Sequence, residues 1–276
     1  MADRNVDSEA VSSSVDRVIE LVAGELRGDK IGAAVRRFAS AAQHDLSLCR
    51  HDLVAWLSKR IGKSLTQKLV HGFAVYPCMG CKGGIVACAA CRGRGIGMRG
   101  DPCEPCVALG AVSCDFCAGS GWITYNFVPQ PLRPFVILER TRIATSQAGR
   151  LPELAESASP KAIAKQIVQT NRILGALDNA VGAAREHLQS HHVKQDIWRK
   201  AIASCAKAGI KLEKRVRHAL KNMAAAPSGG QKKAEDRSAY FAELAGSQQF
   251  AGTCLHHPNL AEIRKAAARK RRASKS

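Results

Sequence analysis

Eight of the eleven cysteines in this chain fall between positions 78 and 117 and form four C-x-x-C pairs. Each pair places two thiolates on one tight turn, which suits two corners of a tetrahedral zinc site with Zn–S bonds of about 2.3 Å. Two such turns complete one four-cysteine site, so four turns predict two sites. The eight candidate ligands are Cys78, Cys81, Cys88, Cys91, Cys103, Cys106, Cys114 and Cys117.

Glycines follow the second cysteine of these pairs, as in CAACRGRG and CDFCAGSG. The turn must point backbone N–H groups at the sulfur atoms, and it therefore needs backbone angles that glycine adopts at low cost. Such N–H···S contacts stabilise and orient the thiolates, as surrounding hydrogen bonds do at other metal sites. We predict that these glycines shape two closed sites that each hold a structural zinc ion.

Other uses of paired cysteines fit less well. Disulfides belong to oxidising compartments, and the polar N-terminus MADRNVDSEAVSSS lacks the apolar stretch of a secretion signal. A thioredoxin-like redox pair needs a βαβ context, which four tandem copies do not provide. An iron–sulfur cluster also accepts four thiolates, but paired glycine-rich turns in even number favour zinc.

The repeat C-x-x-C-x-G-x-G resembles the cysteine-rich zinc module of DnaJ-type co-chaperones. The second and fourth repeats match fully. The first, CMGCKGGI, has Ile85 where the second glycine belongs, and the third, CEPCVALG, has Ala108 in place of the first glycine. The resemblance covers roughly residues 76–125, and the J-domain's His-Pro-Asp signature is missing, so stimulation of a heat-shock ATPase is not implied.

The resemblance implies an elongated set of β-hairpins in which the first repeat pairs with the fourth and the second with the third. Cys78, Cys81, Cys114 and Cys117 would then hold one zinc ion, and the other four cysteines would hold the second. The intervals between successive pairs are 6, 11 and 7 residues. These short intervals leave little room for strands, so we expect a more compact module than in the family.

A looser resemblance links the chain to the late antiterminators of lambdoid phages. Those proteins also embed such cysteine repeats in a basic, helical protein, and they contact DNA and RNA polymerase. The charge distribution bears on this resemblance. Residues 128–276 carry a net charge of +16 out of the +19 of the whole chain, whereas residues 1–76 carry +2. A charge of this size favours contact with a polyanion or an acidic partner, with a merely solvated surface as the alternative.

The cysteine module itself is a poor polyanion site. Residues 77–127 have a net charge of +1 before metal binding. Eight thiolates and two Zn²⁺ ions together contribute about −4, which brings the module to about −3 and the whole chain to about +15. We therefore expect any nucleic-acid contact to lie in residues 193–276.

The regions around the module are predicted to be mainly α-helical. Apolar residues recur at three- and four-residue spacing in the N-terminal region, residues 1–72, and indicate a bundle of three or four helices. The module occupies residues 73–127, and its last stretch, WITYNF, alternates like a strand. Three prolines in VPQPLRP predict that residues 128–159 form an extended linker.

Residues 160–226 predict a long, coiled-coil-like helical hairpin. Ile167, Leu174, Val181 and Leu188 recur every seven residues, and a second helix runs to about position 225 with a strongly basic outer face. The C-terminal region, residues 227–276, is predicted to be flexible and basic, with short helices such as NLAEIRKAAARK and a disordered tail from position 264.

These features predict a non-enzyme. The sequence contains no phosphate-binding glycine loop and no nucleophile elbow. The first functional hypothesis is a zinc-binding protein-interaction or chaperone-like factor that binds a protein partner or an unfolded client. The second is a nucleic-acid-associated regulator of the antiterminator kind. No apolar run is long enough to span a membrane, so we expect no membrane contact and a cytoplasmic protein.

Overall fold

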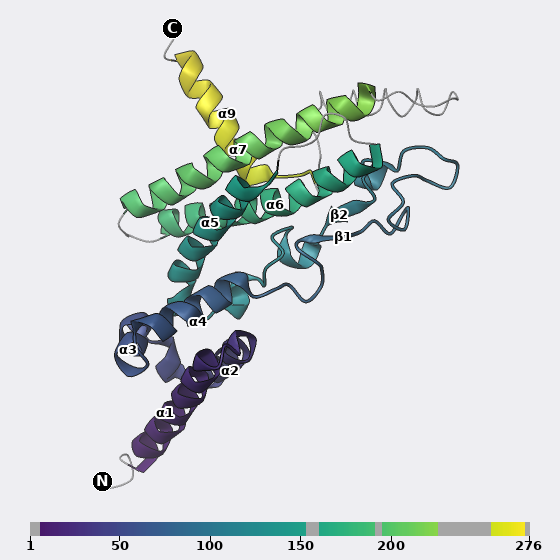
Figure 1. Cartoon of the computed structure of the whole chain (residues 1–276). Helices are drawn as coiled ribbons and strands as arrows, with labels where there is room; N and C mark the ends of the chain where they lie inside the picture. The colour runs from purple at the N-terminus through teal and green to yellow at the C-terminus, as the bar shows by residue number, and fades with distance from the viewer. Residues whose placement is uncertain (1–5, 153–159, 191–194, 226–254, 274–276) are drawn as a thin grey trace. The chain divides into compact units, whose positions relative to one another are not determined.

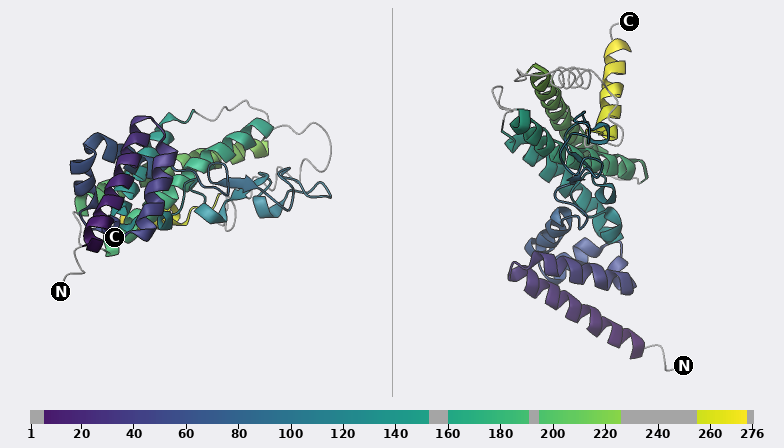
Figure 2. Two further views of the ribbon diagram at one scale, coloured as in Figure 1. Left: turned by 90° about the horizontal axis from the view of Figure 1, so that it is seen from below. Right: turned by 90° about the vertical axis from the view of Figure 1, so that its right-hand side faces the viewer.

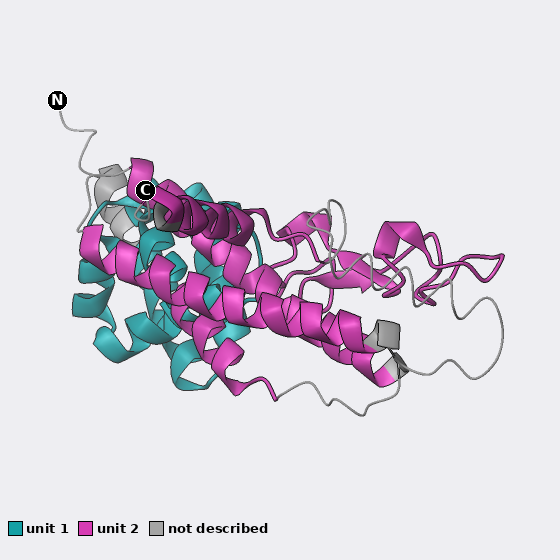
Figure 3. Cartoon of the chain, turned by 90° about the horizontal axis from the view of Figure 1, so that it is seen from above, with its two compact units in different colours: residues 1–76, 123–140 teal, residues 77–122, 141–276 magenta. Residues whose placement is uncertain are grey.

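The computed structural model describes residues 6–152, 160–190, 195–225 and 255–273, and these residues are mainly helical (Figure 1). The chain divides into two compact units (Figure 3). Unit 1 combines residues 1–76 with 123–140, and unit 2 combines residues 77–122 with 141–276. No helix among the described residues is long and apolar enough to cross a bilayer.

Unit 1 contains the predicted N-terminal bundle. Its helices are α1 (Val6–Arg27), α2 (Ile31–His44), α3 (Leu53–Arg60) and α4 (Lys63–Val75). The apolar spacing of the sequence turns one face of each helix into a shared core. Phe38 of α2 and Phe73 of α4 are fully buried there and meet edge to face, with ring centroids 6.2 Å apart.

The predicted extended linker is wrong over most of its length. Residues 133–150 form helix α5 (Arg133–Arg150). A short 3₁₀ turn, Gln130–Leu132, precedes it. The prolines lie at the start of these elements, where a missing N–H costs nothing and a fixed φ favours a helix. They therefore begin a helix instead of extending a linker, and α5 contributes buried residues to both units.

The cysteine module of unit 2 has very little sheet. Strands β1 (Ile85–Ala87) and β2 (Ala111–Ser113) pair antiparallel, with Val86 opposite Val112. The stretch 122–127 is not the predicted strand, because Trp122 makes only a single bridge to Pro77 and Tyr125–Phe127 is a 3₁₀ turn. Strands of three residues agree with the compactness expected from the short intervals between cysteine pairs.

The predicted helical hairpin is present in unit 2. Helices α6 (Pro160–Ser190) and α7 (Gln195–Ala225) pack side by side (Figures 1 and 2). The heptad residues Ile167, Leu174 and Val181 are buried in the seam, as are Trp198 and Val216 on the facing helix. The hydrophobic period of the sequence therefore identified the two contacting faces.

The C-terminal region departs from the prediction in one respect. Helix α9 (Pro258–Ala273) includes most of the tail that was expected to be disordered. Alanine, arginine and lysine are strong helix formers, and they favour a helix here despite the high charge. The first turn of α9 docks on the hairpin. Leu260 donates its backbone N–H to the Asp178 carboxylate of α6 at 2.9 Å, and the Leu260 side chain is fully buried.

Candidate metal centres

The structure brings the eight clustered cysteines together as two tetrads. Each tetrad places four sulfur atoms within 4.8 Å of one another, so each could hold a metal ion. This grouping is the one that the DnaJ-type resemblance implied. Tetrad A consists of Cys78, Cys81, Cys114 and Cys117, and tetrad B of Cys88, Cys91, Cys103 and Cys106.

The sulfur separations match one tetrahedral ion per tetrad. The sulfurs of Cys81 and Cys117 lie 3.6 Å apart, and those of Cys91 and Cys106 lie 3.7 Å apart. Four ligands at about 2.3 Å from one ion give tetrahedral edges of about 3.8 Å. A disulfide would need about 2.05 Å. A multi-iron cluster, in which the cysteines bind different iron atoms, would spread the sulfurs further apart.

The backbone, independently of any metal, holds the turns of each tetrad together in pairs. The first cysteine of every turn donates its N–H to the carbonyl oxygen of a glycine in the partner turn. The four bonds form two reciprocal pairs: Cys78 to Gly121 (3.0 Å) and Cys114 to Gly84 (2.8 Å), Cys88 to Gly110 (2.9 Å) and Cys103 to Gly95 (3.0 Å).

The same four glycines donate their own N–H groups to sulfur. The acceptor is the second cysteine of the same turn, which confirms the predicted role of the glycines. The N···S distances are 3.3 Å for Gly84 to Cys81, 3.2 Å for Gly95 to Cys91, 3.2 Å for Gly110 to Cys106 and 3.3 Å for Gly121 to Cys117. Each glycine thus orients a thiolate and pairs two turns at once.

The turn of the first repeat is one residue shorter than the other three turns, and it therefore has its second glycine one position earlier than the sequence pattern requires. The sequence pattern placed Ile85 at the fourth position after Cys81, but Gly84 at the third position makes the contact to sulfur. In this turn Gly83 and Gly84 both have a positive φ, of 68° and 89°. The adjacent Gly-Gly pair was the signal in the sequence that could have revealed this shorter turn.

The third repeat shows which of the two glycine positions can accept another residue. Ala108 occupies the first position with a φ of 58° and is buried, and a Cβ atom built on Gly93, at the equivalent position of the second repeat, would meet no atom closer than 3.7 Å. The second position is different. A Cβ atom built on Gly110 would lie 2.3 Å from the carbonyl oxygen of Gly93, and one built on Gly95 would lie 2.3 Å from that of Ala108. The fold therefore requires glycine at the second position.

Burial disfavours four ionised thiols in so small a space without a cation. It raises the pKa of the Cys81 and Cys106 thiols well above the usual range. At Cys91 burial also raises the pKa, but the Gly95 N–H and the neighbouring thiols outweigh it and lower the pKa to about 7. A divalent metal ion supplies the positive charge that this donor set lacks.

Tetrad A also lies against the helical hairpin. A Cβ atom built on Gly175 of α6 would lie 2.2 Å from the carbonyl oxygen of Gly119 in the fourth repeat. The side chain of Arg172, one turn earlier on α6, lies against Gly83 of the first repeat, 3.3 Å from a Cβ built there. Both turns of tetrad A therefore rest on the same stretch of α6.

The remaining cysteines lie outside both tetrads or outside the described residues. Cys49 is exposed in unit 1. Cys205 of α7 is buried, and its sulfur contacts the Thr145 hydroxyl of α5 at 3.3 Å. Cys254 lies outside the described residues, as does the neighbouring segment SAYFAEL.

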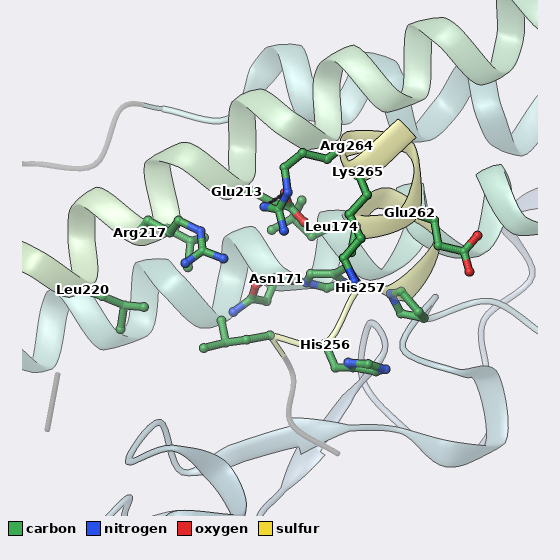
Figure 4. Close-up of a pocket in the computed structure, with 14 residues that line it drawn as sticks. Asn171, Leu174, Glu213, Arg217, Leu220, His256, His257, Glu262, Arg264 and Lys265 are labelled. Carbon is green, nitrogen blue, oxygen red and sulfur yellow. Dashed lines mark hydrogen bonds and ion pairs between the residues drawn. The ribbon is translucent and has the colours of Figure 1, made fainter. Parts of the chain in front are cut away.

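A pocket of about 280 Å³ lies where α9 meets α6 and α7 (Figure 4). Two charged residues of α9 that line it pair with the hairpin: Arg264 pairs with Glu213 of α7 at 3.0 Å, and Glu262 pairs with Arg185 of α6, which lies outside the lining, at 2.8 Å. His257 is buried beside the pocket. Its burial and the charge of His256 together lower the pKa of His257 to about 3. The polar contacts at this pocket attach α9 to the hairpin.

Comparisons of the chain with protein-family models, with curated proteins and with solved structures gave no match. The likeness to DnaJ-type modules therefore rests on the cysteine repeats and on the grouping of the sulfur atoms.

Proposed function

We propose that the chain is a zinc-binding, non-catalytic protein-interaction factor of chaperone-like character. Each tetrad holds one zinc ion, and the ion fixes the turns that display a binding surface. The single observation that carries this proposal is the arrangement of eight cysteine sulfurs in two tetrahedron-sized groups. The cysteines bind zinc only as reduced thiols. Thiols stay reduced in the cytoplasm, where we place the protein.

The ligand sets support a structural role for the metal. All four donors of each tetrad are sulfur, and seven of the eight cysteines are buried. A zinc ion bound by four thiolates keeps no position for water, whereas catalytic zinc sites usually keep one open. The metal would therefore supply folding free energy to a module that has little sheet and little apolar core of its own.

An exposed apolar tip on tetrad A supports protein binding. Met79 of the first repeat is 81% exposed, and Phe116 of the fourth repeat is 62% exposed. Both residues lie between the cysteines of a C-x-x-C pair, and the Phe116 side chain lies next to Gly80. Methionine adapts to varied apolar partners, and contiguous exposed apolar surface marks interaction sites. This tip fits an apolar segment of a partly folded protein.

Metal content tests the zinc assignment directly. We expect native mass spectrometry of the purified chain to show two zinc ions per molecule, and elemental analysis to show zinc and not iron. The double variant Cys78→Ser and Cys114→Ser should retain one ion. One ion or none in the wild-type chain would contradict the two-site proposal.

A client-aggregation assay tests the tip. We expect the zinc-loaded chain to suppress aggregation of a thermally unfolded client, and the double variant Met79→Ser and Phe116→Ser to lose most of this effect while it retains both zinc ions. Leu46→Ser is a matched control, because Leu46 is 88% exposed but lies in unit 1. Equal activity of the tip variant and the wild type would argue against the tip as the binding site.

A second candidate function, a nucleic-acid-associated regulator, is favoured by a separate observation. The net charge of +16 in residues 128–276 includes a row of exposed lysines on α7. In this candidate function the metal-bound module packs against the basic helices and holds them in position, and the helices bind a polyanion. Binding of duplex nucleic acid with a steep dependence on salt concentration would support it, and no binding at low salt would exclude it.

A further inference from the structure

One face of α7 carries a row of lysines that points away from the rest of the hairpin. At 100° per residue, five exposed lysines fall within about 80° of the helix circumference, and His218 lies among them. The buried residues of α7, such as Cys205, Leu212 and Val216, lie on the opposite side. The lysine row, as we call this set, consists of Lys200, Lys207, Lys211, Lys214 and Lys221.

The row has no internal charge compensation among the described residues. None of its five lysines has an ion-pair partner there. Of the two carboxylates on α7, Glu213 is paired with Arg264 of α9, and Asp196 stands in the first turn of the helix, where the helix dipole favours it.

The like charges of the lysine row destabilise α7. Lys207 and Lys211 are four residues apart, and Lys211 and Lys214 are three apart, so their like charges repel and destabilise the helix. A helix that served only solubility could intersperse glutamates at these positions. A linear anion laid along the row would convert the repulsion into attraction.

The length and chemistry of the row match a phosphate backbone. The row spans 21 residue steps, or about 31 Å of helix, which corresponds to roughly nine base pairs of a duplex at about 3.4 Å each. Lysine binds phosphate as a point charge and does not demand a fixed geometry. Contacts of lysine with phosphate oxygens position a protein on a duplex but carry no sequence information, so contact through phosphates alone would be independent of sequence.

The row favours duplexes over unpaired strands. Proteins that bind single strands stack bases on exposed aromatic side chains. The only Phe, Trp or Tyr residue of α7 is Trp198, and it is buried in the seam of the hairpin. The surface therefore offers charge without a stacking platform.

We propose that the lysine row of α7 binds the sugar–phosphate backbone of a nucleic-acid duplex without sequence preference. This inference rests on the nucleic-acid candidate given above and names the surface that would make the contact. It places the duplex on the α7 face opposite the packed hairpin seam.

Fluorescence anisotropy of the full, zinc-loaded chain with labelled duplexes of about 20 base pairs, roughly twice the length of the row, tests the proposal. Duplex DNA and duplex RNA are separate arms that identify the source of the backbone, and a single strand of the same length is a third arm. The key variant neutralises Lys207, Lys211 and Lys214 by Lys→Gln substitutions, which preserve helix propensity.

A matched control removes the same charge from exposed lysines of unit 1, by Lys→Gln substitutions at Lys30, Lys59 and Lys63. We expect the row variant to lose at least tenfold in affinity at low salt. Its plot of log K against log salt should become shallower by about 2–3, because each phosphate contact contributes about 0.9 to the slope. The control should change the affinity less than twofold.

Four results would overturn the proposal, and the first two differ in whether they also exclude the nucleic-acid candidate. Equal effects of the row variant and the control would refute the lysine row but leave the nucleic-acid candidate in place. No binding of any duplex by the wild type at low salt would remove both. Tighter binding of the single strand than of the duplex, or full competition by polyglutamate of equal charge, would also refute the proposal.

Discussion

At the scale of single residues, the structure of the module depends on the second glycine of each turn, and Gly110 shows why. Gly110 donates its N–H to the sulfur of Cys106 and accepts a hydrogen bond from the N–H of Cys88. It also lies so close to the backbone of the partner turn that a Cβ has no room. Sulfur orientation, turn pairing and close packing therefore depend on one residue type at one position.

We expect Gly110→Ala to destabilise tetrad B by about 2 kcal/mol or more, because alanine must adopt a φ of 74° and its Cβ meets the carbonyl oxygen of Gly93. Faster zinc transfer to a chelator and a lower unfolding temperature measure the effect. Gly97→Ala is the control, since Gly97 has no positive φ and its Cβ would lie 3.7 Å from the nearest oxygen, that of Asp101. Equal behaviour of the two variants would refute the requirement.

The neighbouring position should respond differently. Ala108→Gly relieves a left-handed alanine, a gain of about 1–2 kcal/mol. It also loses a buried methyl group, worth about 0.8 kcal/mol, and gives the unfolded chain more freedom. We therefore expect a change in unfolding free energy of less than about 1 kcal/mol by chemical denaturation. A loss as large as that expected for Gly110→Ala would show that the methyl group of Ala108 matters more than its backbone strain.

At the scale of elements, local patterns predicted those parts of the fold whose signals are local. The seven-residue period of Ile167, Leu174 and Val181 identified the buried face of α6, and the C-x-x-C spacing identified the eight ligands, whereas their grouping into two tetrads was implied by the resemblance to DnaJ-type modules. The same reasoning misjudged residues 128–159, because it counted prolines without asking where in a helix they would stand. The contact of Gly175 with Gly119 has no local signal, since it joins segments 56 positions apart in the sequence.

Helix α5 also contains Arg140, which links several segments of unit 1 by hydrogen bonds. Arg140 is fully buried and donates hydrogen bonds to the carbonyl oxygens of Phe73, Ala74 and Ile123, at 2.9–3.4 Å. Two of these carbonyls belong to the last turn of α4, where the helix leaves its acceptors unsatisfied. The guanidinium also lies over the ring of Tyr125, 4.5 Å from its centroid.

We expect Arg140→Met to lower the unfolding free energy of the bundle by about 2–4 kcal/mol, because methionine fills the space but leaves buried carbonyls without donors. Thermal and urea unfolding followed by circular dichroism measure the change. Arg150→Met, at the exposed end of the same helix, should have little effect. A similar small effect of both substitutions would mean that water or other donors satisfy the carbonyls in the variant.

At the scale of the whole molecule, zinc binding should link the fold to pH. Zinc displaces a proton from every thiol that is protonated at the working pH, so the apparent affinity falls as the pH falls. The pKa of Cys91 in metal-free tetrad B is lowered to about 7. Above that pH Cys91 is already ionised, and below it one more proton must leave for each ion bound.

We therefore expect the zinc affinity of tetrad B to fall more steeply below pH 7 than above it, by up to a further factor of about ten per pH unit. Competition with a chromophoric chelator between about pH 6 and 8 measures this. The double variant Cys78→Ser and Cys114→Ser isolates tetrad B for the measurement. A constant slope through this range would exclude ionisation of Cys91 near neutral pH.

The two tetrads differ in what surrounds them, and this predicts different consequences of metal loss. The turns of tetrad A rest on α6 at Arg172 and Gly175, and Asp178, one turn further along α6, holds the first turn of α9. The pairing bonds of tetrad B link Cys88 with Gly110 and Cys103 with Gly95 and stay within residues 88–110. Unfolding of tetrad A therefore removes packing from the hairpin, whereas unfolding of tetrad B leaves α6 covered.

We expect Cys114→Ser to increase amide hydrogen exchange both in the module and along α6 from Arg172 to Asp178. Cys103→Ser, its matched control, should increase exchange within residues 88–110 only, because metal binding at each tetrad supplies the folding free energy of its own turns. Hydrogen-exchange mass spectrometry resolves the two regions in the same sample. If both variants leave α6 equally protected, the hairpin is stable without the module, and tetrad A serves only to display the tip formed by Met79 and Phe116.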